Sequence, residues 1–134
     1  MATTKTMWLA SLVTAINVLV AAGFSIAGLI HPQAMLPAGD VPTEASSIFA
    51  MYAAARAVPL ALITLAAIWR RATSALLILG TLAGVIQLLD AGIGVWLHDV
   101  GKFAGPLLIA IVQFWVLLLL NSSMRGRATT QTSS

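Results

Sequence analysis

The stretch that decides the fold runs from Ser74 to Leu97 and reads SALLILGTLAGVIQLLDAGIGVWL. A helix needs roughly 20 mostly apolar residues to cross the ~30 Å hydrocarbon layer of a membrane. The stretch has that length, and Asp90 is its one charged residue. It therefore predicts a membrane-spanning helix with an ionisable group inside it.

Three further stretches have the same character, and they are residues 7–30, 46–69 and 104–120. The composition agrees, because 60% of the 134 residues are hydrophobic and 8% are charged, against about 25% charged in soluble domains. We therefore expect an all-α membrane protein, a four-transmembrane-helix bundle in which residues 1–120 form one domain. The polar composition of residues 121–134 predicts a disordered tail.

Charge and cysteine content exclude several classes of function. With 7 basic and 4 acidic residues, the chain has too few charges to build the basic face of a nucleic-acid-binding protein. The absence of Cys excludes a thiol redox site, a disulfide and a Cys-ligated metal. The spacing of His31, His98 and Asp99 matches no zinc motif, so neither a metal nor another cofactor is predicted.

The basic residues outside the spans predict the orientation. Loops on the cytoplasmic side carry an excess of Lys and Arg. One side of the four spans holds Lys5, Arg70, Arg71, Arg125 and Arg127, and the other holds Lys102. This predicts that both termini are cytoplasmic.

Polar side chains recur at helical spacing within the spans. Because lipid cannot satisfy polar groups, such side chains are expected to face the bundle or a cavity. At 1.5 Å per residue, the polar groups reach a similar level in the outer half of the membrane: Asn17, Tyr52, Arg56, Gln87, Asp90 and Gln113. Gly80 and Gly84 form a GxxxG motif, which allows close helix approach.

Arg56 and Asp90 are the charged residues inside the predicted spans, and they have opposite signs and similar depths. One interpretation is structural: an ion pair that fixes the register of the second and third spans. The other is functional, because ionisable groups within a membrane usually mark a site. Tyr52 lies one helical turn from Arg56, so an acid, a cation and a phenol could share one pocket.

The functional interpretation predicts a membrane-embedded enzyme that acts on a lipophilic small molecule by acid–base chemistry. Epoxide opening, cyclisation and isomerisation fit these groups, so the candidate activities are isomerase, cyclase and epoxide hydrolase. The candidate catalytic residues are Asp90, Arg56 and Tyr52. The candidate substrate-binding residues are Gln87, Asn17, Gln113, His98 and Trp96, the last two at the outer rim.

The chain resembles a group of small bacterial four-helix membrane proteins, the DoxX-like and related domain-of-unknown-function families. The resemblance covers most of residues 8–120 and is carried by YAAAR (52–56), GVIQLLDAGIG (84–94) and KFAGP (102–106). It implies a four-helix fold in which an inward Arg on the second helix and an Asp on the third correspond to Arg56 and Asp90. It implies little about activity.

Two other functions stay open at the level of sequence. The chain could be a helper or assembly subunit that binds a partner protein in the membrane, or a small proton-coupled transporter. The expected partners are membrane lipid and a lipophilic molecule, without nucleic acid. A homo-oligomer, either a dimer or a trimer, is a further expectation, because four short helices bury little core alone.

Overall fold

The computed structural model describes residues 4–131, and this part of the chain is helical apart from short connections. The helices are α1 (Thr4–Ile30), the 3-10 helix η1 (Pro32–Met35), α2 (Glu44–Trp69), α3 (Thr73–Trp96) and α4 (Val100–Gln131). Each of the four α-helices contains a segment long and apolar enough to cross a membrane. The predicted all-α fold with four span-length helices is confirmed.

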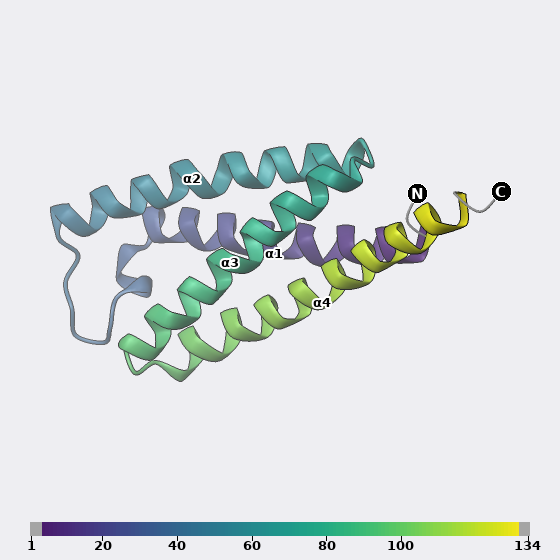
Figure 1. The fold of residues 1–134 in the computed structure, drawn as a ribbon. Coiled ribbons are helices and arrows are strands. Elements are labelled where there is room, and N and C mark those ends of the chain that lie inside the picture. The colour runs from purple at the N-terminus through teal and green to yellow at the C-terminus, as the bar shows by residue number, and fades with distance from the viewer. Residues whose placement is uncertain (1–3, 132–134) are drawn as a thin grey trace.

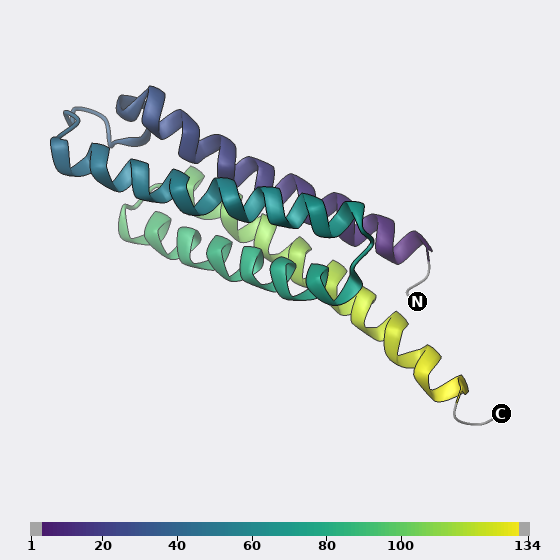
Figure 2. The ribbon, with the colours of Figure 1, turned by 90° about the horizontal axis from the view of Figure 1, so that it is seen from above.

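The fourth helix differs from its prediction. The predicted spans 7–30, 46–69 and 74–97 agree closely with α1, α2 and α3, but α4 extends well beyond the predicted span 104–120 at its C-terminal end. Residues 121–131 are therefore helical rather than a disordered tail, while residues 132–134 of that prediction lie outside the described residues. Extending an existing helix avoids the cost of nucleating a new one. Figure 2 shows the last turns of α4 projecting past the other helices.

The four helices form two closely associated pairs. α1 lies beside α2, and α3 packs along α4. α2 and α3 meet at the turn Arg70–Ala72 and then separate (Figure 1). We call this end of the bundle, where α1 also begins, the turn end. The opposite end, which holds η1 and the corner between α3 and α4, is the loop end.

Glycines allow the close contact between α3 and α4. A Cβ atom added to Gly80 would lie 2.8 Å from Leu117 Cδ2, and one added to Gly84 would lie 2.9 Å from Phe114 Cζ. The close approach predicted from the GxxxG motif is therefore present. Gly94 extends the contact to the loop end, where a Cβ would collide with the backbone at the start of α4.

Helices α2 and α3 end in the same way. Each is followed by a residue with left-handed backbone, Arg71 at φ 51° and His98 at φ 54°. In both turns, the amides of that residue and of the next one donate to carbonyl groups of the last helical turn. This is the Schellman arrangement, which reverses the chain within a few residues.

Asp99 completes the second of these turns and begins α4. Its Oδ1 accepts hydrogen bonds from the backbone N–H groups of Gly101 at 3.0 Å and Lys102 at 3.1 Å. The Lys102 Nζ lies 3.4 Å from Oδ2. The backbone N–H of Lys102, its ammonium group and the Gly101 N–H favour the ionised carboxylate and hold the pKa of Asp99 below its ordinary value, although desolvation acts in the opposite direction.

The segment between α1 and α2 folds back across the loop end. The Lys102 Nζ donates to the carbonyl oxygen of Met35 at 3.3 Å, which joins η1 to the start of α4. Gln33 Nε2 donates to the Asp40 carbonyl at 2.8 Å. α2 then begins with a capping box, in which Thr43 and Ser46 each accept a hydrogen bond from the other's backbone N–H. These bonds hold the connection in place at the loop end. We call this connection, residues 31–43, the strap.

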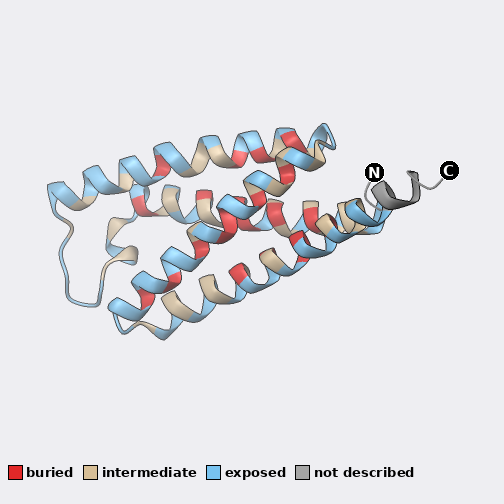
Figure 3. Cartoon of the chain, in the orientation of Figure 1, coloured by how far each residue is buried: buried red, intermediate tan, exposed pale blue. Residues whose placement is uncertain are grey.

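Buried side chains are distributed unevenly among the helices (Figure 3). Near the turn end, one apolar cluster contains Ala10, Leu76, Val116 and Leu120. A second cluster joins three helices through Val18, Ala22, Ala61 and Ala83. α2 is described along its whole length, and its buried residues are Ala54, Ala61, Thr64 and Ala67. α2 is thus held by small side chains, mostly in its turn-end half.

Candidate functional site

A chain of hydrogen-bonded polar side chains crosses the core of the bundle. Gln87 Nε2 donates to Asn17 Oδ1 at 2.8 Å. Asn17 Nδ2 donates to Gln113 Oε1 at 3.1 Å, and Gln113 Nε2 donates to Thr14 Oγ1 at 2.9 Å. All four side chains are buried. The three amides that the sequence placed at a similar depth do meet, and they bond to one another.

This polar chain fixes the relative positions of α1, α3 and α4. A buried amide without a partner is costly in hydrocarbon, so each bond favours the one register that satisfies both groups. A substrate-binding role for Asn17, Gln87 and Gln113 stays a prediction, because in this structure their groups bond within the core. The sequence interpretation did not include Thr14 in the site. Its position three residues before Asn17, on the same helix face, was the available signal.

α2 takes no part in the polar chain. Within the described residues, no side chain of α2 donates to or accepts from another helix in a hydrogen bond. Thr64 lies in the core, and its hydroxyl has no hydrogen-bond partner among those residues. α2 is therefore attached to the bundle by apolar contacts, whereas the other three helices are also joined by polar ones.

Arg56 and Asp90 face the region where α2 and α3 separate. Asp90 lies seven residues after Ala83, and Arg56 lies four residues before Leu60. Ala83 belongs to the apolar cluster that joins α1, α2 and α3, and Leu60 packs against that cluster. Helical residues four or seven apart share a face, so the two charges continue the facing sides of α2 and α3 toward the loop end. We use the name α2–α3 opening for the diverging faces of α2 and α3 on the loop-end side of this cluster.

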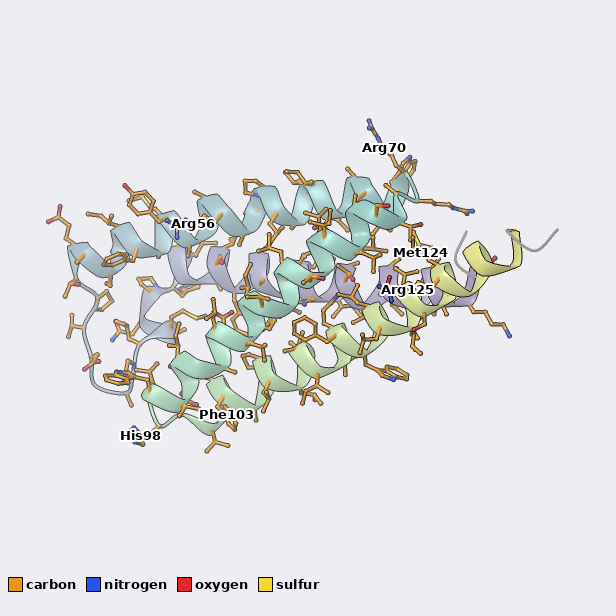
Figure 4. The ribbon with its side chains drawn as sticks, viewed as in Figure 1. Arg56, Arg70, His98, Phe103, Met124 and Arg125 are labelled. Atoms are coloured by element: carbon orange, nitrogen blue, oxygen red, sulfur yellow. The ribbon has the colours of Figure 1, made fainter. Side chains whose placement is uncertain are left out.

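The ion pair between Arg56 and Asp90, which the structural interpretation predicts, is not formed. Among the residues that the structure describes, the ion pair within 4.0 Å is Lys102–Asp99. Arg56, Asp90 and Tyr52 are exposed in the isolated chain, and Tyr52 retains 58% of its accessible surface. Toward the loop end α2 diverges from α3, so the two side chains are not brought within ion-pair distance of each other. Figure 4 shows Arg56 on the loop-end half of α2.

An apolar pocket of about 320 Å³ lies between α1, the strap and α2 at the loop end. Phe24, Ser25 and Gly28 line it from α1, and the strap closes it with Pro32, Met35 and Leu36. From α2 it is lined by Ser46, Phe49, Ala50 and Ala53. Ala53 is the lining residue of α2 furthest from the loop end. Arg56 follows it by three residues along α2 and is not among the residues that line the pocket.

Two predicted site residues lie away from this opening. His98 was expected to bind substrate at the outer rim, but α3 ends at Trp96 and the left-handed backbone at His98 turns the chain. Figure 4 shows His98 at the corner between α3 and α4, pointing away from the bundle. Trp96 retains 83% of its accessible surface. Neither residue joins Tyr52, Arg56 and Asp90.

The comparisons with known proteins identify no relative. No family model matches the chain, and neither a curated protein nor a solved structure matches it. The resemblance to DoxX-like proteins therefore stays a prediction. What the chain can do chemically follows from its own geometry: Tyr52 and Arg56 are exposed on α2, Asp90 is exposed on α3, and an apolar pocket lies between α1, the strap and α2.

Proposed function

We propose that the chain is a membrane-embedded enzyme that binds a lipophilic small molecule in the α2–α3 opening and acts on it by acid–base chemistry. The observation that carries this proposal is the exposure of Arg56 and Asp90 on facing sides of α2 and α3. A charge at the centre of a membrane helix costs about 2.5–3.5 kcal/mol on insertion scales. Two apolar residues would avoid that cost, so the retention of both charges favours a site.

Each group has a distinct role in the proposed chemistry. The carboxyl of Asp90 gives or takes the proton, and the guanidinium of Arg56 stabilises negative charge that develops on the substrate. The hydroxyl of Tyr52 donates a hydrogen bond to the same centre. The pocket between α1, α2 and the strap holds the apolar body of the substrate, which enters from the membrane. Epoxide opening, cyclisation and isomerisation are the reactions that these groups support.

Native mass spectrometry of the protein purified in mild detergent tests this proposal. We expect a bound small molecule on the wild type, and we expect Asp90→Asn and Arg56→Gln to lose it by tenfold or more at unchanged folded yield. Chemical identification of the released molecule then selects the reaction to assay with Tyr52→Phe. The proposal would be contradicted if the wild type carried no small molecule, or if both variants retained every molecule that the wild type binds.

Thr81→Val is the matched control for these variants. Thr81 is an exposed polar residue of α3, and its hydroxyl donates to the Leu77 carbonyl oxygen at 2.7 Å. It lies nine residues before Asp90, which places it on the opposite face of the helix. Retention of the small molecule by this variant shows that removing any polar group from α3 is not enough to release it.

A partner-binding role is the second candidate, because the same exposed charges suit a helix that carries opposite charges at that depth. In this alternative the chain is an assembly subunit, and the α2–α3 opening is its docking surface. Cross-linking through a photoreactive residue at position 52 separates the two candidates. Transfer of the label to a small molecule supports the enzyme, whereas transfer to one defined membrane protein supports the subunit.

We also infer that both termini are cytoplasmic. Exposed Lys5, Arg70, Arg71 and Arg125 at the turn end support this orientation in a bacterial inner membrane. The chain has no native Cys, so single cysteines can report each side. In intact cells, a membrane-impermeant maleimide is expected to label Ala38→Cys in the strap and not Ser122→Cys in α4. The reverse labelling would overturn the orientation.

A further inference from the structure

A second groove lies on the other side of α3, between α3 and α4. Its volume is about 480 Å³, and it is lined by Leu77, Ile78, Thr81, Phe114, Leu117, Leu118 and Asn121. Because Thr81 lies on the face of α3 opposite Asp90, this groove is separate from the α2–α3 opening. It also lies nearer the turn end of the bundle, since its α3 residues belong to the first half of that helix.

The groove suits a hydrocarbon chain over most of its length. Five of its lining residues are apolar. The Thr81 hydroxyl is already used in its bond to the Leu77 carbonyl oxygen, so the side chain leaves its methyl group for contact. A flexible acyl chain packs along such a surface by dispersion contacts and needs no hydrogen bond.

The end of the groove toward the turn end is polar. Asn121 lines it there, and Arg125 follows one turn later on the same face of α4, seven residues after Leu118. Neither Asn121 nor Arg125 has a side-chain hydrogen bond or ion pair within the described part of the chain. Leu76, in the first turn of α3, packs with Leu120, so Arg125 lies near the level at which α3 begins. Figure 4 places Arg125 at this end of the bundle.

The surrounding charge favours an anion at that place. Lys5, Arg70, Arg71 and Arg125 are exposed at the turn end. The described acidic residues lie in the strap, at the start of α2, in the loop-end half of α3 and at the α3–α4 corner. A guanidinium group binds phosphate through two parallel hydrogen bonds, and an amide such as that of Asn121 can donate a third.

We propose that this groove binds one phospholipid with an anionic headgroup. One acyl chain lies between α3 and α4 along Leu77, Leu117 and Leu118, and the phosphate group is held by Arg125 and Asn121. The lipid thus covers an apolar surface that the chain leaves open, and it anchors the end of α4 to one leaflet. This site is independent of the proposed enzymatic function, because it shares no residue with the α2–α3 opening.

Lipid competition followed by native mass spectrometry tests the proposal. The protein is exchanged into detergent micelles that contain equal amounts of phosphatidylglycerol and phosphatidylcholine, and the retained lipids are counted. A basic residue near a membrane surface favours anionic lipid by about fivefold. We expect the wild type to retain phosphatidylglycerol with at least that preference, Arg125→Gln to lose the preference, and Asn121→Leu to reduce it.

Two further variants separate a built site from general attraction. Arg70→Gln removes an exposed cation at the same end but in the turn between α2 and α3, and it is expected to keep the wild-type preference. Thr81→Phe fills the groove and is expected to release both lipids. The proposal is overturned if Arg70→Gln lowers the preference as much as Arg125→Gln, because charge alone then explains it. Unchanged lipid retention by Thr81→Phe would overturn it as well.

Discussion

α3 has a close neighbour on one side and a distant one on the other, and the two sides are built differently. Toward α4, glycines bring the backbones together, and Gln87 joins a chain of satisfied amides. Toward α2, the helices part beyond Ala83, and Asp90 is left without a partner within the described residues. Polar groups of similar depth thus have opposite surroundings, one set in the core and the other at the opening.

The difference indicates which polar groups maintain the fold and which are available for chemistry. Buried amides that bond to one another in hydrocarbon specify the register of the helices that carry them. Unpaired charges contribute nothing to stability that apolar residues could not supply better. Across residues 4–131, α1, α3 and α4 are joined by polar bonds and α2 is attached through apolar contacts alone, an arrangement that suits a site open to molecules from the membrane.

Gly94→Ala should have the largest effect on stability, because it changes the side of α3 that packs closely against α4. The added Cβ would collide with the backbone of Lys102 and Phe103, which no rotamer change can relieve. We expect a loss of about 3 kcal/mol or more in the free energy of unfolding, measured by steric trapping in detergent. Gly92→Ala is the control, since nothing lies within 4 Å of a Cβ there. Equal effects of the two substitutions would disprove the close contact.

Asn17→Leu should have the second-largest effect on stability, because Asn17 lies in the middle of the buried series of hydrogen-bonded side chains. Its removal leaves Gln87 without an acceptor and Gln113 without a donor. A buried polar group without a partner costs about 1–3 kcal/mol, and we expect a loss in that range by the same unfolding measurement. Thr81→Val, which changes a polar group on an exposed face, should stay within about 0.5 kcal/mol. An unchanged free energy of unfolding in Asn17→Leu would mean that these hydrogen bonds do not fix the register of the helices.

Asp90→Asn tests the open side of α3. Breaking a buried ion pair by removing one partner costs about 3–5 kcal/mol. Because Asp90 has no such partner here, we expect unfolding free energy to stay within about 0.5 kcal/mol of wild type or to rise. The bound small molecule should nevertheless be lost. A loss of stability on the scale of a broken pair would show that Arg56 and Asp90 are paired in the membrane.

Asp99→Asn should have the smallest effect, seen at acidic pH. The pKa of Asp99 is lower in the folded chain than its ordinary value of 3.8. Its ionised form therefore stabilises the fold above that value, and the contribution is lost as the pH falls through the folded pKa. We expect the Tm difference between wild type and variant to shrink as the pH is lowered from neutral to below 3.8. A constant difference would assign the effect to the amide itself.

Hydropathy and spacing were sufficient to predict the spans and the close contact of α3. Residues 74–97 repeat small residues at intervals that stack on one face, and Gly80, Gly84 and Gly94 do lie against α4. The depth estimate also placed Asn17, Gln87 and Gln113 together, since helical rise is fixed by backbone geometry. These features depend on local regularities that one helix carries in its own sequence.

The relation between Arg56 and Asp90 could not be predicted in the same way. Depth is a property of one helix, whereas the separation of two helices depends on everything packed around them. Here the strap occupies the loop end. The buried alanines of α2 are Ala54, Ala61 and Ala67, and α2 packs more extensively against α1 than against α3. The helical structure of residues 121–131 was not predicted for a related reason. Their polar composition carries no information about the packed helix that precedes them and that they extend.

The bond between Lys102 and Met35 has a consequence for biosynthesis. Its two ends are separated by 67 positions in the chain, so α2, α3 and the first residues of α4 are synthesised after Met35 and before the bond can form. The strap therefore cannot be joined to α4 until Lys102 has been synthesised and has reached the loop end. Protection of the strap from a protease would mark the moment at which the start of α4 has packed there.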